Sequence, residues 1–352
     1  MKNKYSHLKI ALHKNKLDSI INKNVSAPTY VRIKPTNRCN HNCFFCIYNE
    51  SYANMHNHMG YKDELSREKL LEILEDFKEI GVKAITYSGG GEPLIHPNIE
   101  EIMEKTLEYD IDLSIITNGQ KLSGRKAEIL AKAKWVRISM DYYDSKGFKI
   151  SKRGSARMYD EIIENIKEFS NKPHKCDIEI NFIITKENYL HLEESVKLLK
   201  PLGIENIRYS PVWIKNMEEY HKPIRDTVIA KLKLIKELYQ DDFFKIYTSY
   251  NKNSIINTAA KRSYNFCSFM QIVPVIGADY NVYNCHNQAY SKNGILGSIN
   301  NQKFSELWFS KNTAKYFESF DPQINCDGIQ CAADSKNMFI NELINTSPDN
   351  FI

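Results

Sequence analysis

The chain has 352 residues, of which 42% are hydrophobic and 11% aromatic, so it can build a core and is not a disordered protein. Lys and Arg outnumber Asp and Glu by 48 to 43, a surplus too small to indicate a nucleic-acid or membrane-surface binder. The longest apolar run, around Ile272–Ile276, is far shorter than the roughly 18 residues that span a bilayer. The basic N-terminus has no apolar stretch typical of a secretory signal. We therefore expect a soluble, cytoplasmic protein that binds neither nucleic acid nor membrane.

Strand-like and helix-like segments alternate from Thr29 to about Tyr247. The predicted strands are β-branched or aromatic runs at Tyr30–Ile33, Val82–Tyr87, Leu113–Thr117, Trp135–Met140, Ile178–Thr185 and Ile207–Tyr209. The helices predicted between them are Glu68–Ile80, Ile99–Tyr109, Ser123–Ala133, Tyr159–Ser170, Leu190–Lys200 and Val228–Tyr239. This alternation predicts an α/β fold with a parallel sheet whose functional loops follow the strands. Six units favour a partial (β/α)6 barrel over residues 29–248, although a flat doubly wound sheet has the same periodicity.

The two ends of the chain have other patterns. Residues 1–28 are predicted to be an N-terminal extension. Residues 249–352 begin with a polar, linker-like stretch and contain short strand-like runs at Gln271–Ile276 and Asn281–Tyr283, followed by two short helices. We expect a small C-terminal α+β domain that carries cysteines.

Eight cysteines are the most informative feature, because in a reducing compartment clustered cysteines are more often metal ligands than disulfides. Cys39, Cys43 and Cys46 follow the first strand with the spacing Cys-x3-Cys-x2-Cys. Three thiolates leave one iron of a [4Fe–4S] cluster open, whereas a structural zinc site uses four ligands. A zinc knuckle completed by a histidine is the alternative, with the candidate ligands His41, His56 and His58.

The cysteine run, with Phe45 just before its last cysteine, resembles the signature of the radical S-adenosylmethionine (radical SAM) enzymes. Ser88–Pro93, at the end of the second predicted strand, is similar to the Gly-Gly-Glu motif of that family. The resemblance implies that Cys39, Cys43 and Cys46 hold a [4Fe–4S] cluster and that its open iron binds S-adenosylmethionine. It also implies that an external one-electron donor, such as a flavodoxin or a ferredoxin, reduces the cluster and that a 5′-deoxyadenosyl radical then takes hydrogen from a substrate C–H bond.

The same resemblance implies roles for further residues. The methionine amine of S-adenosylmethionine is expected at Gly90, Gly91 and Glu92, and the adenine near Phe45. Ser139 matches the ribose-contacting position, and Arg153 is similar to the arginine that pairs with the methionine carboxylate. Asn118 and Asn181 lie at or near strand ends that face the site.

A second group of cysteines, Cys267, Cys285, Cys326 and Cys331, lies in the C-terminal region. Their arrangement resembles the extension of the SPASM/twitch subgroup of radical SAM enzymes. Four cysteines imply one auxiliary [4Fe–4S] cluster, although the last pair is Cys-x4-Cys where Cys-x2-Cys is expected, which leaves Cys331 open as a ligand. A structural zinc ion is the alternative. The remaining cysteine, Cys176, precedes its strand and is expected at the far face of the barrel.

The predicted reaction is oxidation of a sugar, polyol or aminocyclitol-like metabolite, because a fully ligated second cluster can accept an electron. The layout resembles that of twitch enzymes of the 2-deoxy-scyllo-inosamine dehydrogenase type. Peptide modification or epimerisation is the alternative, and a non-catalytic metal-binding protein is the third. Residues after the sixth strand either line a substrate pocket or cover the open side of the barrel: Trp213, Lys215, Tyr220 and His221.

Overall fold

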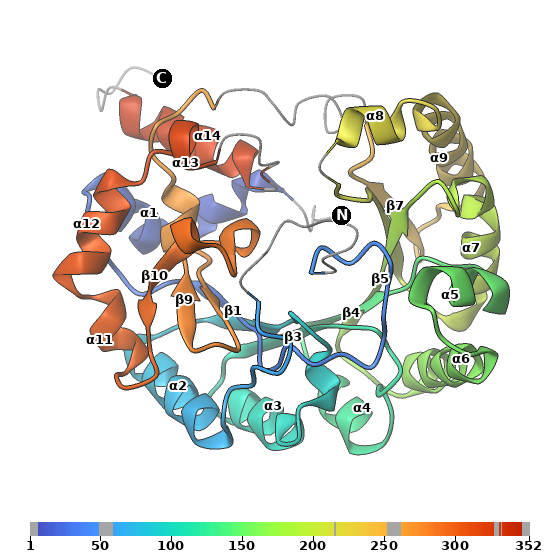
Figure 1. Ribbon diagram of the computed structural model, residues 1–352, viewed down its shortest axis with the longest axis horizontal. Coiled ribbons are helices and arrows are strands. Elements are labelled where there is room, and N and C mark those ends of the chain that lie inside the picture. Colours follow the sequence, from blue (N-terminus) through green and yellow to red (C-terminus); the bar gives the residue numbers. More distant parts are fainter. Residues whose placement is uncertain are drawn as a thin grey trace.

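The computed structural model describes residues 6–48, 59–214, 216–251, 262–326, 331 and 333–346. Within these residues one curved sheet of ten strands has the order β10-β9-β8-β1-β2-β3-β4-β5-β6-β7. Helices cover the outside of the curve, while the inside is open toward the viewer in Figure 1. The C-terminal elements, orange and red, lie on the β1 side of the parallel strands.

Seven strands follow the chain in order, each parallel to the one before. They are β1 (Tyr30–Ile33), β2 (Ala84–Tyr87), β3 (Asp112–Thr117), β4 (Trp135–Ser139), β5 (Asp177–Ile184), β6 (Asn206–Pro211) and β7 (Lys245–Thr248). The helices between them are α2 (Arg67–Ile80), α3 (Ile99–Glu108), α4 (Gly124–Leu130), α5 (Ser145–Lys152), α6 (Ala156–Asn171), α7 (Leu192–Leu199), α8 (Met217–His221) and α9 (Arg225–Tyr239).

Local sequence explains why these elements form. In α2, Ser66 caps the first turn by accepting a hydrogen bond from the Lys69 backbone, and Gly81 ends the helix at φ 84°. In β1, Val31 and Ile33 are buried in the core and alternate with half-buried residues on the inside of the barrel. The inner wall is therefore lined by polar residues, and the apolar residues hold the helices to the sheet.

The predicted fold class is confirmed, because the sheet is parallel and curved and its helices lie on the outside. Strand β7 was not predicted. It is placed by pairing with β6 rather than by a periodic pattern of its own. The Lys245 N–H donates to the carbonyl of Glu205, just before β6, at 2.9 Å. Helix α5 was also not predicted, because its sequence is largely polar. The Asp144 side chain caps it by accepting from the Gly147 backbone at 2.7 Å.

The C-terminal region continues the same sheet. Strand β8 (Val275–Ile276) pairs in parallel with β1, and β9 (Asn281–Tyr283) and β10 (Ile295–Ser298) follow as antiparallel neighbours. Among the residues described here, four α-helices follow these strands: α11 (Phe304–Trp308), α12 (Lys311–Ser319), α13 (Pro322–Asn325) and α14 (Asp334–Asn345). The predicted strand at Gln271–Ile276 is shorter than expected, because its start belongs to the 3-10 helix η6 (Ser268–Gln271). A domain boundary after residue 248 stays a prediction.

The N-terminal segment packs against the C-terminal region. It contains the 3-10 helix η1 (His7–Leu12) and α1 (Lys14–Ile21). A separate apolar cluster joins these two elements to α14 and to the segment between η6 and β8. Its buried side chains are Ile10, Leu17, Ile20, Ile272, Val273 and Ile340. The first and last parts of the described chain therefore lie side by side.

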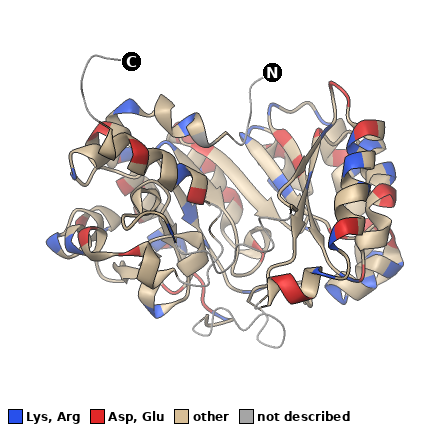
Figure 2. Ribbon diagram, turned by 90° about the horizontal axis from the view of Figure 1, so that it is seen from above, with Lys and Arg blue, Asp and Glu red and all other residues tan. Residues whose placement is uncertain are grey.

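Charged residues of both signs are interspersed over the outer helices, as Figure 2 shows. In the described part of the chain, no helix combines the length and the apolar character needed to cross a membrane.

Candidate active site

The first three cysteines lie in the loop after β1, at the edge where the parallel strands end. Cys39 is exposed, and Cys43 and Cys46 are half-buried. A tight turn joins the last two, because the Cys46 N–H donates to the Cys43 carbonyl at 3.3 Å. Burial raises the pKa of the Cys43 thiol to about 11. A metal that binds this thiol as thiolate must therefore displace its proton.

The C-terminal end of α5 holds this loop. The carbonyls of Ser151 and Lys152 accept hydrogen bonds from the backbone of Phe44 and Asn42, both at 3.3 Å. The Lys152 ammonium is buried and forms an ion pair with Asp141 at 2.5 Å. Burial alone lowers the pKa of Lys152, but the charges of Asp141 and the Cys43 thiolate outweigh burial and raise it above its ordinary value. A buried cation thus lies beside the cysteines.

Phe45 and Arg153 differ in their surroundings. The Lys152 ammonium is 5.1 Å from the centre of the Phe45 ring. Arg153, the next residue after Lys152, is exposed and has a left-handed backbone with φ 54°. The structure therefore brings Lys152 rather than Arg153 to the cysteine loop, and the role predicted for Arg153 stays a prediction.

The glycine turn after β2 packs directly on the cysteine loop. The Gly91 N–H donates to the Thr36 carbonyl at 3.1 Å, and the Glu92 N–H donates to the Arg38 carbonyl at 2.8 Å. A Cβ atom on Gly91 would lie 1.8 Å from the Arg38 carbonyl oxygen, and one on Gly90 would lie 2.0 Å from the Asn37 side chain. Gly91 therefore requires glycine, because its obstacle is backbone, whereas a side chain at Gly90 would require the Asn37 side chain to move.

Glu92 is buried at the ends of β2 and β3. Its carboxylate accepts hydrogen bonds from the Leu94 backbone at 3.0 Å, the Thr117 hydroxyl at 2.7 Å and the Asn118 backbone at 2.7 Å. Burial raises the pKa of Glu92 to about 6, although these donors oppose the shift. One carboxylate oxygen accepts only the Asn118 bond among these three, and it can accept another. The Asn118 side chain also reaches the cysteine loop, where it donates to Asn40 at 2.8 Å.

Ser139 and Asn181 face the inside of the barrel next to each other. They are register partners on β4 and β5. Asn181 lies in the middle of β5 rather than near its end, and it accepts a hydrogen bond from Ser210 of β6 at 3.5 Å. The structure thus places both residues on the inner wall, below the cysteine loop, and their roles at a ligand stay predictions.

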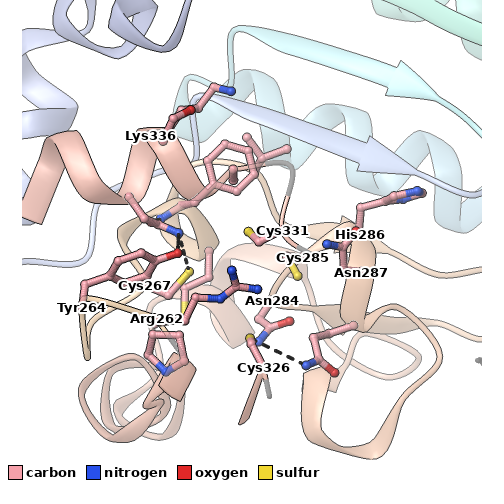
Figure 3. Close-up of a pocket in the computed structure, with 18 of the residues that line it drawn as sticks. Arg262, Tyr264, Cys267, Asn284, Cys285, His286, Asn287, Cys326, Cys331 and Lys336 are labelled. Carbon is pink, nitrogen blue, oxygen red and sulfur yellow. Dashed lines mark hydrogen bonds between the residues drawn. The ribbon is translucent and has the colours of Figure 1, made fainter. Parts of the chain in front are cut away.

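The four C-terminal cysteines come from the ends of different elements and surround one cavity. Cys267 precedes η6, Cys285 follows β9, Cys326 follows α13, and Cys331 comes shortly before α14. Their side chains line a cavity of about 400 Å³, as Figure 3 shows. Burial raises the pKa of the Cys267 thiol to about 12. Cys331 faces the same cavity as the other three, so its looser spacing in the sequence does not remove it from the group.

Two amide side chains point at these sulfur atoms. Asn337 Nδ2 donates to Cys267 Sγ at 3.4 Å, and Gln288 Nε2 donates to Cys326 Sγ at 3.9 Å. Amide donors to cysteine sulfur are among the interactions that tune iron–sulfur clusters.

The spacing of the cysteines bears on which metal group fits. Among the described residues, no three His, Cys, Asp or Glu side chains converge closely enough to bind one metal ion. A mononuclear zinc site needs such convergence, because all its ligands contact the same ion. An iron–sulfur cluster places each thiolate on a different iron, so its ligands lie farther apart. Cysteine thiolates bind both kinds of metal group, so the assignment of a cluster to either cysteine group stays a prediction.

Of the histidines considered as ligands for the first site, the structure describes only His41, whose buried Nδ1 has no hydrogen-bond partner among the described residues. His41 Nε2 is hydrogen-bonded to Gln120 at 3.0 Å, and the ring packs edge-on against Phe148. His56 and His58 lie outside the described residues. After the sixth strand, His221 is buried and hydrogen-bonded to the Val212 carbonyl and the Tyr250 hydroxyl, both at 3.1 Å, so it acts as a structural residue there. Lys215 also lies outside the described residues.

Sequence reasoning did not identify two buried lysines near the cysteine loop, Lys34 and Lys152. Lys34 donates to the Tyr48 hydroxyl at 2.6 Å and to the Gly89 carbonyl at 2.9 Å, joining the two ends of the cysteine loop to the glycine turn. Burial, and next the charge of Arg32, lower the pKa of Lys34 to about 7. Its position, directly after a predicted strand and before the cysteines, could have identified Lys34 as a residue of the site. Lys152 had no such signal, because only the fold brings it to the loop.

Comparisons with known proteins agree with this geometry. The Radical SAM superfamily profile matches residues 33–199. "Probable GTP 3',8-cyclase" from Halobacterium salinarum is 25% identical over 288 residues, which cover 77% of this chain and 78% of that protein. "Tungsten-containing aldehyde ferredoxin oxidoreductase cofactor-modifying protein" from Pyrococcus furiosus is 27% identical over 216 residues, which cover 60% of this chain and 59% of that protein.

Solved structures share the fold. SuiB of Streptococcus suis, bound to precursor peptide SuiA, superposes with a TM-score of 0.64 at 18% identity. The match covers 100% of this chain and 80% of the SuiB chain. The structure of anSMEcpe with bound AdoMet has a TM-score of 0.59 at 19% identity, covering 83% of each chain. The chain therefore contains a radical SAM domain, which covers residues 33–199.

Proposed function

We propose that this radical SAM enzyme oxidises a small-molecule substrate and uses a second, C-terminal [4Fe–4S] cluster to accept an electron. Cys39, Cys43 and Cys46 would hold the first cluster, and Cys267, Cys285, Cys326 and Cys331 the second. S-adenosylmethionine would lie on the inner side of the cysteine loop. The residues proposed to contact it are Phe45, Gly90, Gly91, Glu92, Ser139, Arg153 and Asn181.

When bound, the first cluster supplies the electron that cleaves S-adenosylmethionine, whose 5′-deoxyadenosyl radical takes hydrogen from the substrate. The protein's own residues supply position and charge. The glycine turn leaves backbone groups accessible, and the carboxylate of Glu92 provides a fixed negative charge for an ammonium group. The buried Lys152 ammonium balances negative charge at Cys43, beside which it lies.

One observation supports the second cluster above all. Four thiols from separate elements line one cavity, which is the ligand number of a [4Fe–4S] cluster held by cysteines alone. A cluster with four cysteine ligands has no open iron for a substrate, so electron transfer is the role that its ligand set favours. Oxidation of the substrate radical needs such an acceptor.

The relatives bear on the substrate class. Relatives named for action on nucleotides include the GTP 3',8-cyclases and an S-adenosylmethionine-dependent nucleotide dehydratase from Flammeovirga pacifica. SuiB was crystallised with a peptide, and its likeness to this chain is one of fold. We favour a small molecule, with a sugar, polyol or aminocyclitol-like group as the oxidised part and a flavodoxin or ferredoxin as the electron donor.

Iron content and S-adenosylmethionine cleavage test this proposal together. After anaerobic reconstitution, the chain should hold about eight irons, as two [4Fe–4S] clusters require. Replacing Cys39, Cys43 and Cys46 by alanine should leave about four irons and abolish 5′-deoxyadenosine formation. Replacing Cys267 and Cys285 by alanine should also leave about four irons but keep 5′-deoxyadenosine formation.

Other results would contradict parts of the proposal. Cleavage that survives the first set of changes would remove the assignment of the first site. About four irons and one zinc in the unchanged chain would remove the internal electron acceptor and with it the case for oxidation.

A further inference from the structure

Tyr290 belongs to the C-terminal region, but its side chain is buried at the first cysteine site. It follows Cys285 after the 3-10 helix η7 (His286–Gln288). Its hydroxyl donates a hydrogen bond to Asn37 Oδ1 and accepts one from the Ala278 backbone at 3.2 Å. Asn37 lies in the barrel, at the start of the loop that carries the first three cysteines. Tyr290 therefore joins the C-terminal region directly to that loop.

The backbone of Tyr290 is left-handed, with φ 62°. A residue with a bulky side chain rarely adopts this conformation, and the surrounding structure has to enforce it. The Tyr48 ring packs edge-on against the Tyr290 ring at 5.8 Å between centres, and the Tyr283 ring lies at 5.5 Å. These contacts hold the ring in a fixed place at the cost of an unfavourable backbone conformation.

The Tyr290 hydroxyl fixes a side chain that lies against the glycine turn. Asn37 is buried, and both ends of its amide have partners, because Oδ1 accepts from Tyr290 and Nδ2 donates to the Gly60 carbonyl at 2.9 Å. A Cβ atom on Gly90 would lie 2.0 Å from Asn37 Oδ1. The oxygen that the Tyr290 hydroxyl holds is therefore the atom closest to where a side chain on Gly90 would be.

The Tyr290 ring contacts a second support of the same turn. The buried Lys34 ammonium lies 5.4 Å from the centre of the Tyr290 ring and 4.7 Å from the centre of the Tyr48 ring. The same ammonium donates to the Gly89 carbonyl at 2.9 Å. Tyr290 thus touches both side chains that hold the first two glycines of the turn, Asn37 with its hydroxyl and Lys34 with its ring.

Tyr316 offers a contrast within the C-terminal region. Its hydroxyl donates to the Asn293 carbonyl at 2.6 Å and accepts from Asn284 Nδ2 at 2.9 Å. It therefore makes as many hydrogen bonds as the Tyr290 hydroxyl, but both partners belong to the C-terminal region itself. Removal of each hydroxyl in turn separates an effect on the glycine turn from an effect on the C-terminal region.

We infer that Tyr290 is a positioning residue for S-adenosylmethionine, because through Asn37 and Lys34 it holds the glycine turn in the shape that receives the methionine amine. It acts through these two side chains and not by contact with the ligand. A turn that is ordered before binding loses less conformational freedom when the ligand binds, so the affinity is higher. This inference rests on the proposed function, since Gly90 and Gly91 are the contacts proposed there for the methionine amine.

Binding of S-adenosylmethionine to the reconstituted chain, measured by anaerobic equilibrium dialysis, tests this role. Tyr290→Phe keeps the ring and removes the hydroxyl, and it should raise the Kd about three- to tenfold, as loss of one buried hydrogen bond implies. In 5′-deoxyadenosine formation with dithionite as reductant, the KM for S-adenosylmethionine should rise by a similar factor with little change in kcat. Tyr316→Phe is the matched control and should change neither value.

A double-mutant cycle tests whether the hydroxyl acts through Asn37. Asn37→Ala removes the acceptor and should also weaken binding of S-adenosylmethionine. The double variant with Tyr290→Phe should bind as Asn37→Ala alone does, because residues that act on one contact are not additive. Independent, additive losses would contradict this route. Each variant should keep about eight irons, as two [4Fe–4S] clusters require.

Other outcomes overturn the inference in different ways. An unchanged Kd in the Tyr290→Phe variant, or an equal change in the Tyr316→Phe variant, would show that the hydroxyl does not position the turn. Loss of iron in the Tyr290→Phe variant would show that Tyr290 holds the C-terminal region together instead. If the unchanged chain does not bind S-adenosylmethionine, both the inference and the proposed function are wrong. Weaker binding in the Tyr290→Phe variant of a chain whose C-terminal site holds zinc would overturn the proposed function alone.

Discussion

The two cysteine sites differ in how their side chains are brought together. The first three cysteines lie within eight residues of one loop, between Cys39 and Cys46. The other four are spread from Cys267 to Cys331 and meet only because β8 joins the barrel sheet and α14 packs beside η6. The first three cysteines are close together in the sequence, and the surrounding residues only hold their loop in place. The other four cysteines come close together only when the whole chain is folded.

The supports of the two sites also differ in charge. A buried ion pair, Asp141 with Lys152, lies behind the first site. Behind the second site is a neutral amide, Asn337, which is 1% exposed and accepts a hydrogen bond from the Phe269 backbone at 2.9 Å. This contrast can be tested by removing each support in turn.

The largest effect is expected from Lys152→Met. The change leaves the buried Asp141 carboxylate without its cation, and breaking a buried pair in this way costs about 3–5 kcal/mol. Urea unfolding should show this loss of stability, and the first site should take up less iron while the second keeps about four.

Lys149→Met is the matched control, because Lys149 is exposed on the same helix. Its effect on the free energy of unfolding should stay within about 0.5 kcal/mol. Equal losses of iron from both sites in the Lys152 variant would show that α5 supports the whole fold rather than one loop.

A smaller effect is expected from Asn337→Leu. It leaves the partly buried Phe269 N–H without this acceptor and removes a donor from Cys267, which should cost about 1–3 kcal/mol. The reduction potential of the second cluster should shift, because hydrogen bonds to sulfur tune it.

The first cluster is the internal control for that measurement, and Asn345→Ala, at an exposed position on the same helix, is the control variant. Unchanged 5′-deoxyadenosine formation is expected. A matching potential shift in both clusters would contradict the independence of the two sites.

The smallest effect is expected far from both sites, at Asp241 before β7. A hydrogen bond from Lys200, at 2.5 Å, and backbone donors lower the pKa of Asp241 from its ordinary 3.8 to about 2. Its contribution to stability is therefore complete above pH 3.8 and is lost as the pH falls toward 2. Asp241→Asn should lower Tm slightly at neutral pH, and the difference from the unchanged chain should disappear near pH 2.

Neither cysteine site should respond to this change. An iron content that falls in the Asp241 variant would mean that the β7 edge of the sheet and the cysteine sites are coupled.

Much of this protein could be predicted from its sequence alone. Periodicity located six of the seven ordered parallel strands and the helices between them, since buried strands and amphipathic helices leave strong local patterns. The short strand β7 and the polar helix α5 lacked such patterns. The spacing of the first three cysteines and the glycine turn after β2 pointed to the radical SAM superfamily, because the residues of that site are near neighbours in the sequence.

Only the tertiary structure decided which charges surround these residues. It placed Lys152 rather than Arg153 beside the cysteine loop, because the α5 turn buries one side chain and exposes the next. It also gathered Arg32, Arg208 and Lys336 from three separate elements around the cavity of the second site. Electrostatic environment depends on distance and burial in space, and neither quantity can be read from positions along a chain.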